Sequence, residues 1–349
     1  MHQTFQKLSS IHGPLMYLRL GSVDCVVAPN PELAKELLKH HELTFSTRHH
    51  TAAIEHLTYN SSFAFAPYGP YWKFIKKLTT FELLGNRTLG QTLPVRTKEL
   101  HHFIGILLGK SKSGETVNLT QELLKLTNNV ISQMMLSIRC SGTVDQADGF
   151  RTLVREENEI FGYDSLLEKI MRDREELRKN KKPNDDDVKD FLDIMLDIFE
   201  DEHSEVQLTR NHIKALILDF LTAATDKTAL IAVEWALAEL INNPEVLRKA
   251  QQELDQVVGK SRQGSEGVGG STQVSALELL PFGTGRRGCP GISLAMQELA
   301  VTLAALVQCF DWNAGGGVDM SERPGLTAPR AYKLNCVPLA RFTPTLFAT

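Results

Sequence analysis

The sequence has little cysteine, no large excess of either charge and no long uninterrupted apolar run. Five cysteines in 349 residues are an odd and sparse set, which excludes a disulfide framework and favours a reducing compartment. Lys plus Arg number 38 and Asp plus Glu 42, so the net charge of −4 gives no indication of nucleic acid as a partner. A 42% hydrophobic content excludes a wholly disordered chain and suffices for one large domain or two smaller ones.

No segment has the pattern of a signal peptide or a membrane anchor. Residues 1–7 lack an apolar run, so we expect neither a leader nor an anchor in this chain. The most apolar long segment, residues 213–241, makes a poor membrane span because charged side chains interrupt it. These include Asp219, Asp226, Lys227, Glu234 and Glu239.

Helical periodicity dominates the sequence, so the predicted fold class is mainly α with a small β component. Pro31 begins a predicted helix, and apolar spacing predicts further helices over 71–84, 96–109, 119–138, 152–182, 191–200, 208–241 and 244–258, with an apolar one ending near 310. Residues 14–28, around Gly21 and Ser22, predict a β-hairpin, and residues 335–342 predict short strands. No internal repeat is visible.

Two stretches lack the apolar content of a core element. Residues 259–281 contain five Gly and four Ser in 23 positions, which is the composition of a linker. The charged run 172–190 predicts a solvated helix end and loop in preference to a ligand site. We therefore describe one domain in three parts: 1–258, a Gly/Ser-rich junction 259–281, and 282–349.

The loop 282–291 is the stretch most informative about chemistry. Its glycines let the backbone pass close to a flat group and leave N–H groups free. Cys289 precedes Pro290, a residue favoured at the first helical position, and a helix N-terminus favours a thiolate. Arg286 and Arg287 add positive charge suited to a carboxylate. A thiolate in such a loop is a candidate ligand for a soft metal.

Other interpretations of this loop stay open at this point. A free cysteine is often only a small buried hydrophobe, and the Gly-Arg-Arg-Gly segment 285–288 is also compatible with a turn that carries solvated charges. A nucleophilic Cys289 is disfavoured, because no histidine or other base lies near it in the sequence.

The spacing Phe282-x-x-Gly285-x-Arg287-x-Cys289-x-Gly291 resembles the haem-binding signature of the cytochrome P450 monooxygenases. The resemblance implies a haem b cofactor whose iron is held by the Cys289 thiolate. It further implies that Arg287 pairs with a haem propionate, that Phe282 packs beside the sulfur, and that Gly285 and Gly291 belong to the same cofactor loop. Thiolate ligation favours O–O cleavage, the core of monooxygenase chemistry.

A second segment is similar to another haem-contacting part of the family. Trp72-x-x-x-Lys76 resembles the Trp-x-x-x-Arg helix whose members contact the haem propionates. Lys76 keeps the positive charge of the family's arginine but loses its bidentate fork. The alternative interpretation of Trp72 is an ordinary aromatic residue of the core.

The long predicted helix 208–241 resembles the family's central helix over the distal face of the haem. Ala223-Ala224-Thr225-Asp226 stands where the family has its oxygen-activation motif. The resemblance implies that Asp226, with Thr225 or Thr228, manages protons. A surface charge is the alternative interpretation of Asp226.

Finer resemblance points to plant enzymes of the flavone synthase and flavanone 2-hydroxylase kind. It is carried by residues 63–78, 128–136, 234–244, 281–291 and 322–331. It implies a small hydrophobic phenolic substrate, electrons from NADPH through NADPH-cytochrome P450 reductase, and a place on the cytosolic face of the endoplasmic reticulum membrane. Relatives that oxidise pterocarpans or triterpenes are the alternative for the substrate.

The sequence departs from the family pattern in three places. The junction 259–281 stands where the family has its K-helix and meander, and Phe161-Gly162 runs into Tyr163 where the family has more of its F–G region. Position 227 is Lys where the family usually has Thr, and a buried charged Lys facing the haem would be costly. The resemblance therefore implies an incomplete cytochrome P450 fold.

These departures have two expected consequences. The hairpin 14–28 would lack partner strands, and uncovered apolar faces would lower stability. The family's Glu-x-x-Arg pair also has no clear counterpart, because Glu245/Arg248 and Glu175/Arg178 are each expected to form only a solvated salt bridge. The alternative to an active enzyme is thus a degenerate or mis-spliced relative that folds poorly or binds haem without turnover.

Overall fold

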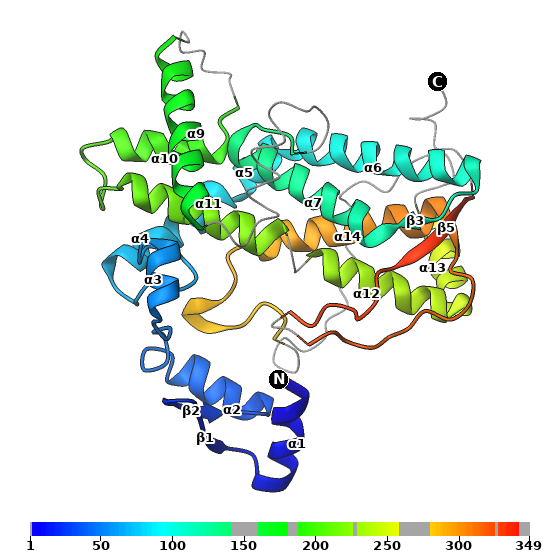
Figure 1. Ribbon diagram of the computed structural model, residues 1–349, viewed down its shortest axis with the longest axis horizontal. Coiled ribbons are helices and arrows are strands. Elements are labelled where there is room, and N and C mark those ends of the chain that lie inside the picture. Colours follow the sequence, from blue (N-terminus) through cyan, green and yellow to red (C-terminus); the bar gives the residue numbers. More distant parts are fainter. Residues whose placement is uncertain are drawn as a thin grey trace.

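The computed structural model describes residues 2–140, 160–180, 188–225, 229–257, 280–324 and 327–341. Its described part is mainly helical with two small sheets, which confirms the predicted fold class (Figure 1). The helices are α1 (His2–His12), α2 (Pro31–Lys35), α3 (Ala52–Thr58), α4 (Pro70–Lys77), α5 (Asn86–Gln91), α6 (Leu93–Ser113), α7 (Leu119–Leu136), α9 (Ile160–Asn180), α10 (Phe191–Glu200), α11 (Arg210–Thr225), α12 (Ala229–Asn242), α13 (Pro244–Val257) and α14 (Ile292–Cys309). The strands are β1 (Met16–Leu20), β2 (Val23–Val27), β3 (Val117–Asn118), β4 (Phe310–Asn313) and β5 (Asn335–Ala340).

The core lies where α7 packs against α6, α11 and α12, and where α14 packs against α12 and α13 (Figure 1). Apolar residues at helical spacing supply its side chains, and Leu107, Leu123, Leu237 and Leu306 are among those that are fully buried. By length and composition alone, α14 would also suit a membrane span. Its packing in this core accounts for that apolar character.

The predicted hairpin is present as β1 paired antiparallel with β2. Gly21 takes a φ of 62° in the connecting turn, a conformation that glycine adopts without strain. Within the described ranges the hairpin has no third strand, as expected from the sequence. Tyr17 and Val26 are exposed as a result.

The second sheet has the order β3–β5–β4, with both neighbours antiparallel to β5. The prediction of strands near 335–342 is confirmed by β5. Neither β3 nor β4 was predicted, because a two-residue strand has no alternation to read and β4 continues directly from the end of α14.

Two helix boundaries differ from the sequence prediction. The helix after Pro290 begins at Ile292, with Gly291 as its N-cap, so Cys289 lies three residues before the first helical residue. The predicted long helix 208–241 is described as α11 and α12, which lie nearly along one line in Figure 1. Residues 226–228 between them lie outside the described part of the chain.

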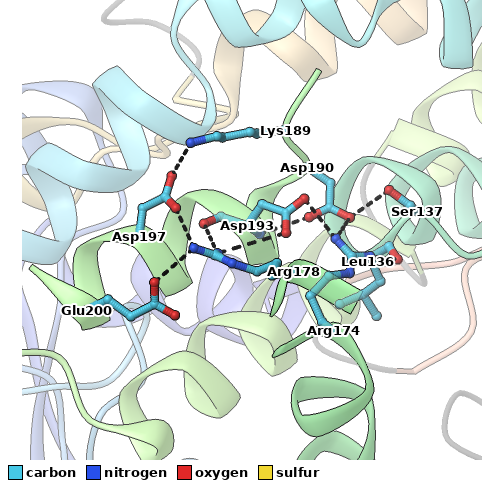
Figure 2. Close-up of polar contacts among 9 residues, drawn as sticks. All are labelled: Leu136, Ser137, Arg174, Arg178, Lys189, Asp190, Asp193, Asp197 and Glu200. Carbon is cyan, nitrogen blue, oxygen red and sulfur yellow. Dashed lines mark hydrogen bonds and ion pairs between the residues drawn. The ribbon is translucent and has the colours of Figure 1, made fainter. Parts of the chain in front are cut away.

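The charged run 172–190 is solvated only in part, and its residues 181–187 lie outside the described part of the chain. Arg172 is exposed, as predicted, but Arg174 and Arg178 pair with acids of α10. Figure 2 shows arginines of α9 meeting the acidic residues at the start of α10. The Arg174 guanidinium lies 2.6 Å from Asp190 and 2.9 Å from Asp193, and it also donates to the Leu136 carbonyl. Asp190 is itself the buried N-cap of α10. Arg174 and Asp190 therefore join α9 to α10 through an ion pair, and both form hydrogen bonds to the end of α7.

One of the two predicted solvated pairs is present. Arg248 lies 2.8 Å from Glu245, and both side chains are exposed. The prediction for Glu175 and Arg178 is wrong, because Glu175 pairs with Arg210 and Arg178 pairs with acidic residues of α10. Each side chain finds an opposite charge on another helix in place of its neighbour one turn away.

Candidate functional site

The loop 282–291 places the sulfur of Cys289 on the surface just before α14. The Cys289 N–H donates to the Phe282 carbonyl at 2.9 Å, and the Gly288 N–H donates to the Gly285 carbonyl at 3.0 Å. The Cys289 sulfur is exposed and accepts the Gly291 N–H at 3.3 Å. A sulfur that faces outward and accepts a backbone N–H is accessible to a metal ion, and the N–H fixes its orientation. It is not a buried hydrophobe.

Gly285 is required by a close approach within the chain itself. Its φ is 67°, and a Cβ atom there would lie 2.2 Å from the Leu38 carbonyl oxygen. Leu38 belongs to the π-helical turn Glu36–His40 after α2, so this glycine faces backbone and not a flat group. Arg286 pairs with Glu42 of the next turn at 2.8 Å. The loop is thus fastened to residues 36–42 on one side.

Arg287 fastens the loop on the other side. Its guanidinium donates to the backbone carbonyls of Ser46 at 2.7 Å, Phe63 at 3.3 Å and Ala66 at 2.6 Å. The same group lies 4.3 Å from the centre of the Trp72 ring. The Arg287 guanidinium, the three carbonyls and the Trp72 ring therefore hold the loop against the segment before α4.

Arg287 has no acidic partner among the described residues, although it is half-buried. Burial, together with the positive charge of Arg48, lowers its pKa to about 10. Carbonyl oxygens solvate a guanidinium but do not neutralise it. A half-buried cation without a counterion is therefore a place where an added carboxylate would be stabilised.

The structure brings Trp72 and Lys76 of α4 to this loop. The Trp72 N–H donates to the Phe63 carbonyl at 2.9 Å, and its buried ring stacks on Phe63. The Lys76 ammonium donates to the Gly288 carbonyl at 2.6 Å. Burial lowers the pKa of Lys76, and the nearby Cys289 opposes that effect. Trp72 thus supports Arg287, while Lys76 adds a second cation next to the sulfur.

These residues fit a haem. The donor set is one outward-facing thiol sulfur, with Lys76 close to it and Arg287 two residues before it in the loop. Neither cation forms an ion pair within the described ranges. A porphyrin supplies four nitrogen ligands and two carboxylates of its own, so the protein would need to give only a sulfur ligand and cations. In the described part of the chain, no group of three His, Cys, Asp or Glu side chains could hold a metal ion alone.

Asp219 is a half-buried acid near this site, and in the sequence it stands out only as a charge that interrupts an apolar segment. It lies on α11 and accepts hydrogen bonds from the Ser62 hydroxyl and the Phe63 N–H, each at 2.5 Å. Burial raises its pKa to about 6, and these donors oppose that rise. The signal available in the sequence was an acid on the apolar face of a predicted helix.

The predicted proton-handling residues are only partly described. Thr225 is the last residue of α11, while Asp226 and Thr228 lie outside the described residues. Their roles stay predictions, as do the haem contacts of Trp72 and Phe282.

Comparison with known proteins identifies the family. The model of the family "Cytochrome P450" matches residues 1–167, 162–268 and 264–336, which together span most of the chain. The chain belongs to the cytochrome P450 family, whose members are haem-dependent oxidoreductases.

Curated relatives share sequence along nearly the whole chain. Cytochrome P450 93B2 of Gerbera hybrida is 46% identical over 450 residues that cover 98% of this chain and 88% of the relative. The 3,9-dihydroxypterocarpan 6A-monooxygenase of Glycine max is 38% identical, over 98% of this chain and 90% of its own length. The 2-hydroxyisoflavanone synthase of the same plant is 35% identical, over 98% of this chain and 88% of its own length.

A solved structure confirms the fold. A zebra fish cytochrome P450, in a structure with progesterone, superposes with a TM-score of 0.80 at 20% identity and covers 97% of this chain and 99% of its own. At that identity the likeness concerns the fold alone.

The comparisons also confirm that the fold is incomplete. An alignment of 450 residues is longer than this 349-residue chain, so the relatives carry internal residues without a counterpart here. The three matched segments of the family model meet at 162–167 and 264–268. These positions coincide with the two sites of missing sequence predicted near Phe161-Gly162 and in the junction 259–281.

Substitution of Gly285 by Ala tests the close approach to Leu38. We expect Gly285→Ala to lower the free energy of unfolding by about 2 kcal/mol more than Gly283→Ala. Gly283 is a matched control, because its φ of 68° is nearly the same but no atom lies within 4 Å of a Cβ built there. Urea unfolding of both variants measures the difference. Equal losses would contradict the close approach.

The pKa of Asp219 predicts a pH dependence of stability. Because folding raises this pKa from 3.8 to about 6, folding favours the protonated acid. Its contribution to stability is therefore present below pH 3.8 and is lost as the pH rises through 6. We expect the unfolding free energy of the wild-type chain, relative to Asp219→Asn, to fall by up to about 3 kcal/mol between pH 4 and pH 7.

Urea unfolding at a series of pH values measures this relative stability. Tyr71 titrates far above this pH range, and His212 is present in both proteins, so its titration cancels in the difference. A difference independent of pH would show that Asp219 has an ordinary pKa.

Proposed function

We propose that this chain is a haem-thiolate monooxygenase that oxidises a flavanone-like plant phenolic. One observation carries the proposal: the outward-facing Cys289 sulfur lies in the same short loop as the half-buried Arg287, which has no acidic partner in the described ranges. A thiolate with adjacent cations matches the iron and the carboxylates of haem b.

The residues of this chain have separable roles in the proposed reaction. Cys289 would hold the iron, while Arg287 and Lys76 would hold the propionates. Bound haem supplies the activation of O2, with electrons delivered from NADPH through a cytochrome P450 reductase. Asp226, with Thr225 or Thr228, is proposed to hold and move the protons that this reaction consumes.

The substrate proposal comes from the relatives. The named relatives include a pterocarpan monooxygenase and a 2-hydroxyisoflavanone synthase, both of which are named for flavonoid-type compounds. A small hydrophobic phenolic is therefore the proposed substrate class, with a flavanone first and a pterocarpan as the alternative. By the same analogy we propose a location at the cytosolic face of the endoplasmic reticulum membrane.

A second candidate is a haem-binding relative without turnover. It is favoured by the shortened sequence and by apolar side chains that stay exposed beside the loop and on the hairpin, such as Met296 at 49% and Tyr17 at 67%. Such surfaces lower solubility and stability. The two candidates share the haem site and differ only in catalysis.

A Cys289→Ser variant tests the haem ligand. We expect the wild-type chain, reduced and exposed to carbon monoxide, to give the Soret band that marks a thiolate-bound iron, and the variant to lack that band because an alcohol is a poor ligand for soft iron. Absorption spectroscopy measures both. Cys140→Ser is the control, because Cys140 is a buried residue away from the loop, and its band should persist.

Turnover then separates the two candidates. With reductase and NADPH, oxidation of naringenin or liquiritigenin by the wild-type chain supports the enzyme. A thiolate band without product supports the second candidate, and a band that persists in Cys289→Ser would refute the ligand assignment.

A further inference from the structure

The turn 62–66 lies between α3 and α4. It contacts both α11 and the loop 282–291, which is called the haem loop below. Its backbone is closed by hydrogen bonds from the N–H groups of Phe65 and Ala66 to the Ser62 carbonyl, at 3.3 and 2.7 Å. Ser62 and Ala66 are buried. The Ser62 hydroxyl also accepts the Ala64 N–H at 3.1 Å, so the N–H groups on this side of the turn are largely paired.

Asp219 binds the N–H side of this turn. One of its carboxylate oxygens accepts the Ser62 hydroxyl and the other accepts the Phe63 N–H. Charge-assisted hydrogen bonds to two oxygens of one carboxylate fix both the position and the orientation of the turn. The acid is held on α11, which packs against α7 in the core, so its position is set by the interior of the molecule.

The carbonyl side of the same turn binds the haem loop. The Phe63 carbonyl accepts both the Trp72 N–H and the Arg287 guanidinium, and the Ala66 carbonyl accepts Arg287 at 2.6 Å. Two of the three carbonyls that bind Arg287 therefore belong to the turn that Asp219 fixes. Arg287 lies two residues before Cys289 in the loop.

We propose that Asp219 is a positioning residue for the haem loop. It acts through the turn 62–66, whose carbonyl groups hold Arg287 and thereby the backbone that presents the Cys289 sulfur. Hydrogen bonds at both sides of the turn connect α11 to the loop, and they join residues more than 60 positions apart in the sequence. Only one consequence of this proposal rests on the proposed function: loss of Asp219 would weaken haem retention.

Hydrogen exchange on the full chain without haem tests the connection. The reporters are the paired amides of the turn, at Phe63 and Ala66, and of the loop, at Gly288 and Cys289. In Asp219→Asn we expect exchange to become about tenfold faster in the turn and about threefold or more faster in the loop, because one charge-assisted acceptor is lost. Ser62→Ala should produce the same pattern more weakly.

Asp255→Asn is the matched control. Asp255 is a half-buried acid of α13 that pairs with Arg341 at 2.8 Å, far along the chain from the turn. Its loss should leave exchange in both the turn and the loop unchanged. If Asp219→Asn speeds exchange throughout α6 and α7 as well, the variant is globally unstable and Ser62→Ala decides the question.

One outcome would overturn the proposal: in the variant that folds, exchange becomes faster in the turn but is unchanged in the loop. Asp219 would then be a local structural residue. A second readout is the rate at which bound haem passes to an acceptor globin, which should rise in Asp219→Asn and not in Asp255→Asn. If the wild-type chain binds no haem, the proposed function fails, while the exchange experiment still decides whether Asp219 positions the loop.

Discussion

The rest of the site depends on the hydrogen bonds that the Arg287 guanidinium donates to three backbone carbonyls. This guanidinium is a half-buried cation bound by three neutral carbonyls and the face of Trp72, with no acidic partner among the described residues. Hydrogen bonds to carbonyls satisfy its donors but leave its charge uncompensated. The loop is therefore held in place by a cation, Arg287, that an added anion would stabilise.

This arrangement explains how a shortened member of the family can still present its cysteine. The loop carrying Cys289 is fixed by contacts with the N-terminal third of the chain: with the Leu38 turn through Gly285, with Glu42 through Arg286, and with residues 46–66 through Arg287. None of these contacts needs the segment that the relatives have before the loop. The two-stranded hairpin, in contrast, exposes apolar side chains such as Tyr17 and Val26, and exposed apolar surface lowers solubility.

Local patterns could predict the parts of the structure that local physics decides. The hairpin at Gly21, the exposed pair Glu245–Arg248 and the loop before α14 all follow from residues close together in the sequence. Long-range pairing could not be read in this way: Arg287 meets Ser46 across 241 positions, and Arg178 pairs with α10 in place of its neighbour Glu175. Asp219 was visible as a charge on an apolar helix face, but its partners at Ser62 and Phe63 appear only when the chain is folded.

The central claim is that Arg287 and Lys76 bind carboxylates beside the Cys289 sulfur. A comparison of haem with its dimethyl ester, in which both propionates are neutral, tests this claim most directly. Titration of the full chain with each porphyrin should show binding of haem at least about tenfold tighter than binding of the ester. In Arg287→Met, that preference should shrink. Equal affinity of the wild-type chain for the two porphyrins would contradict the account.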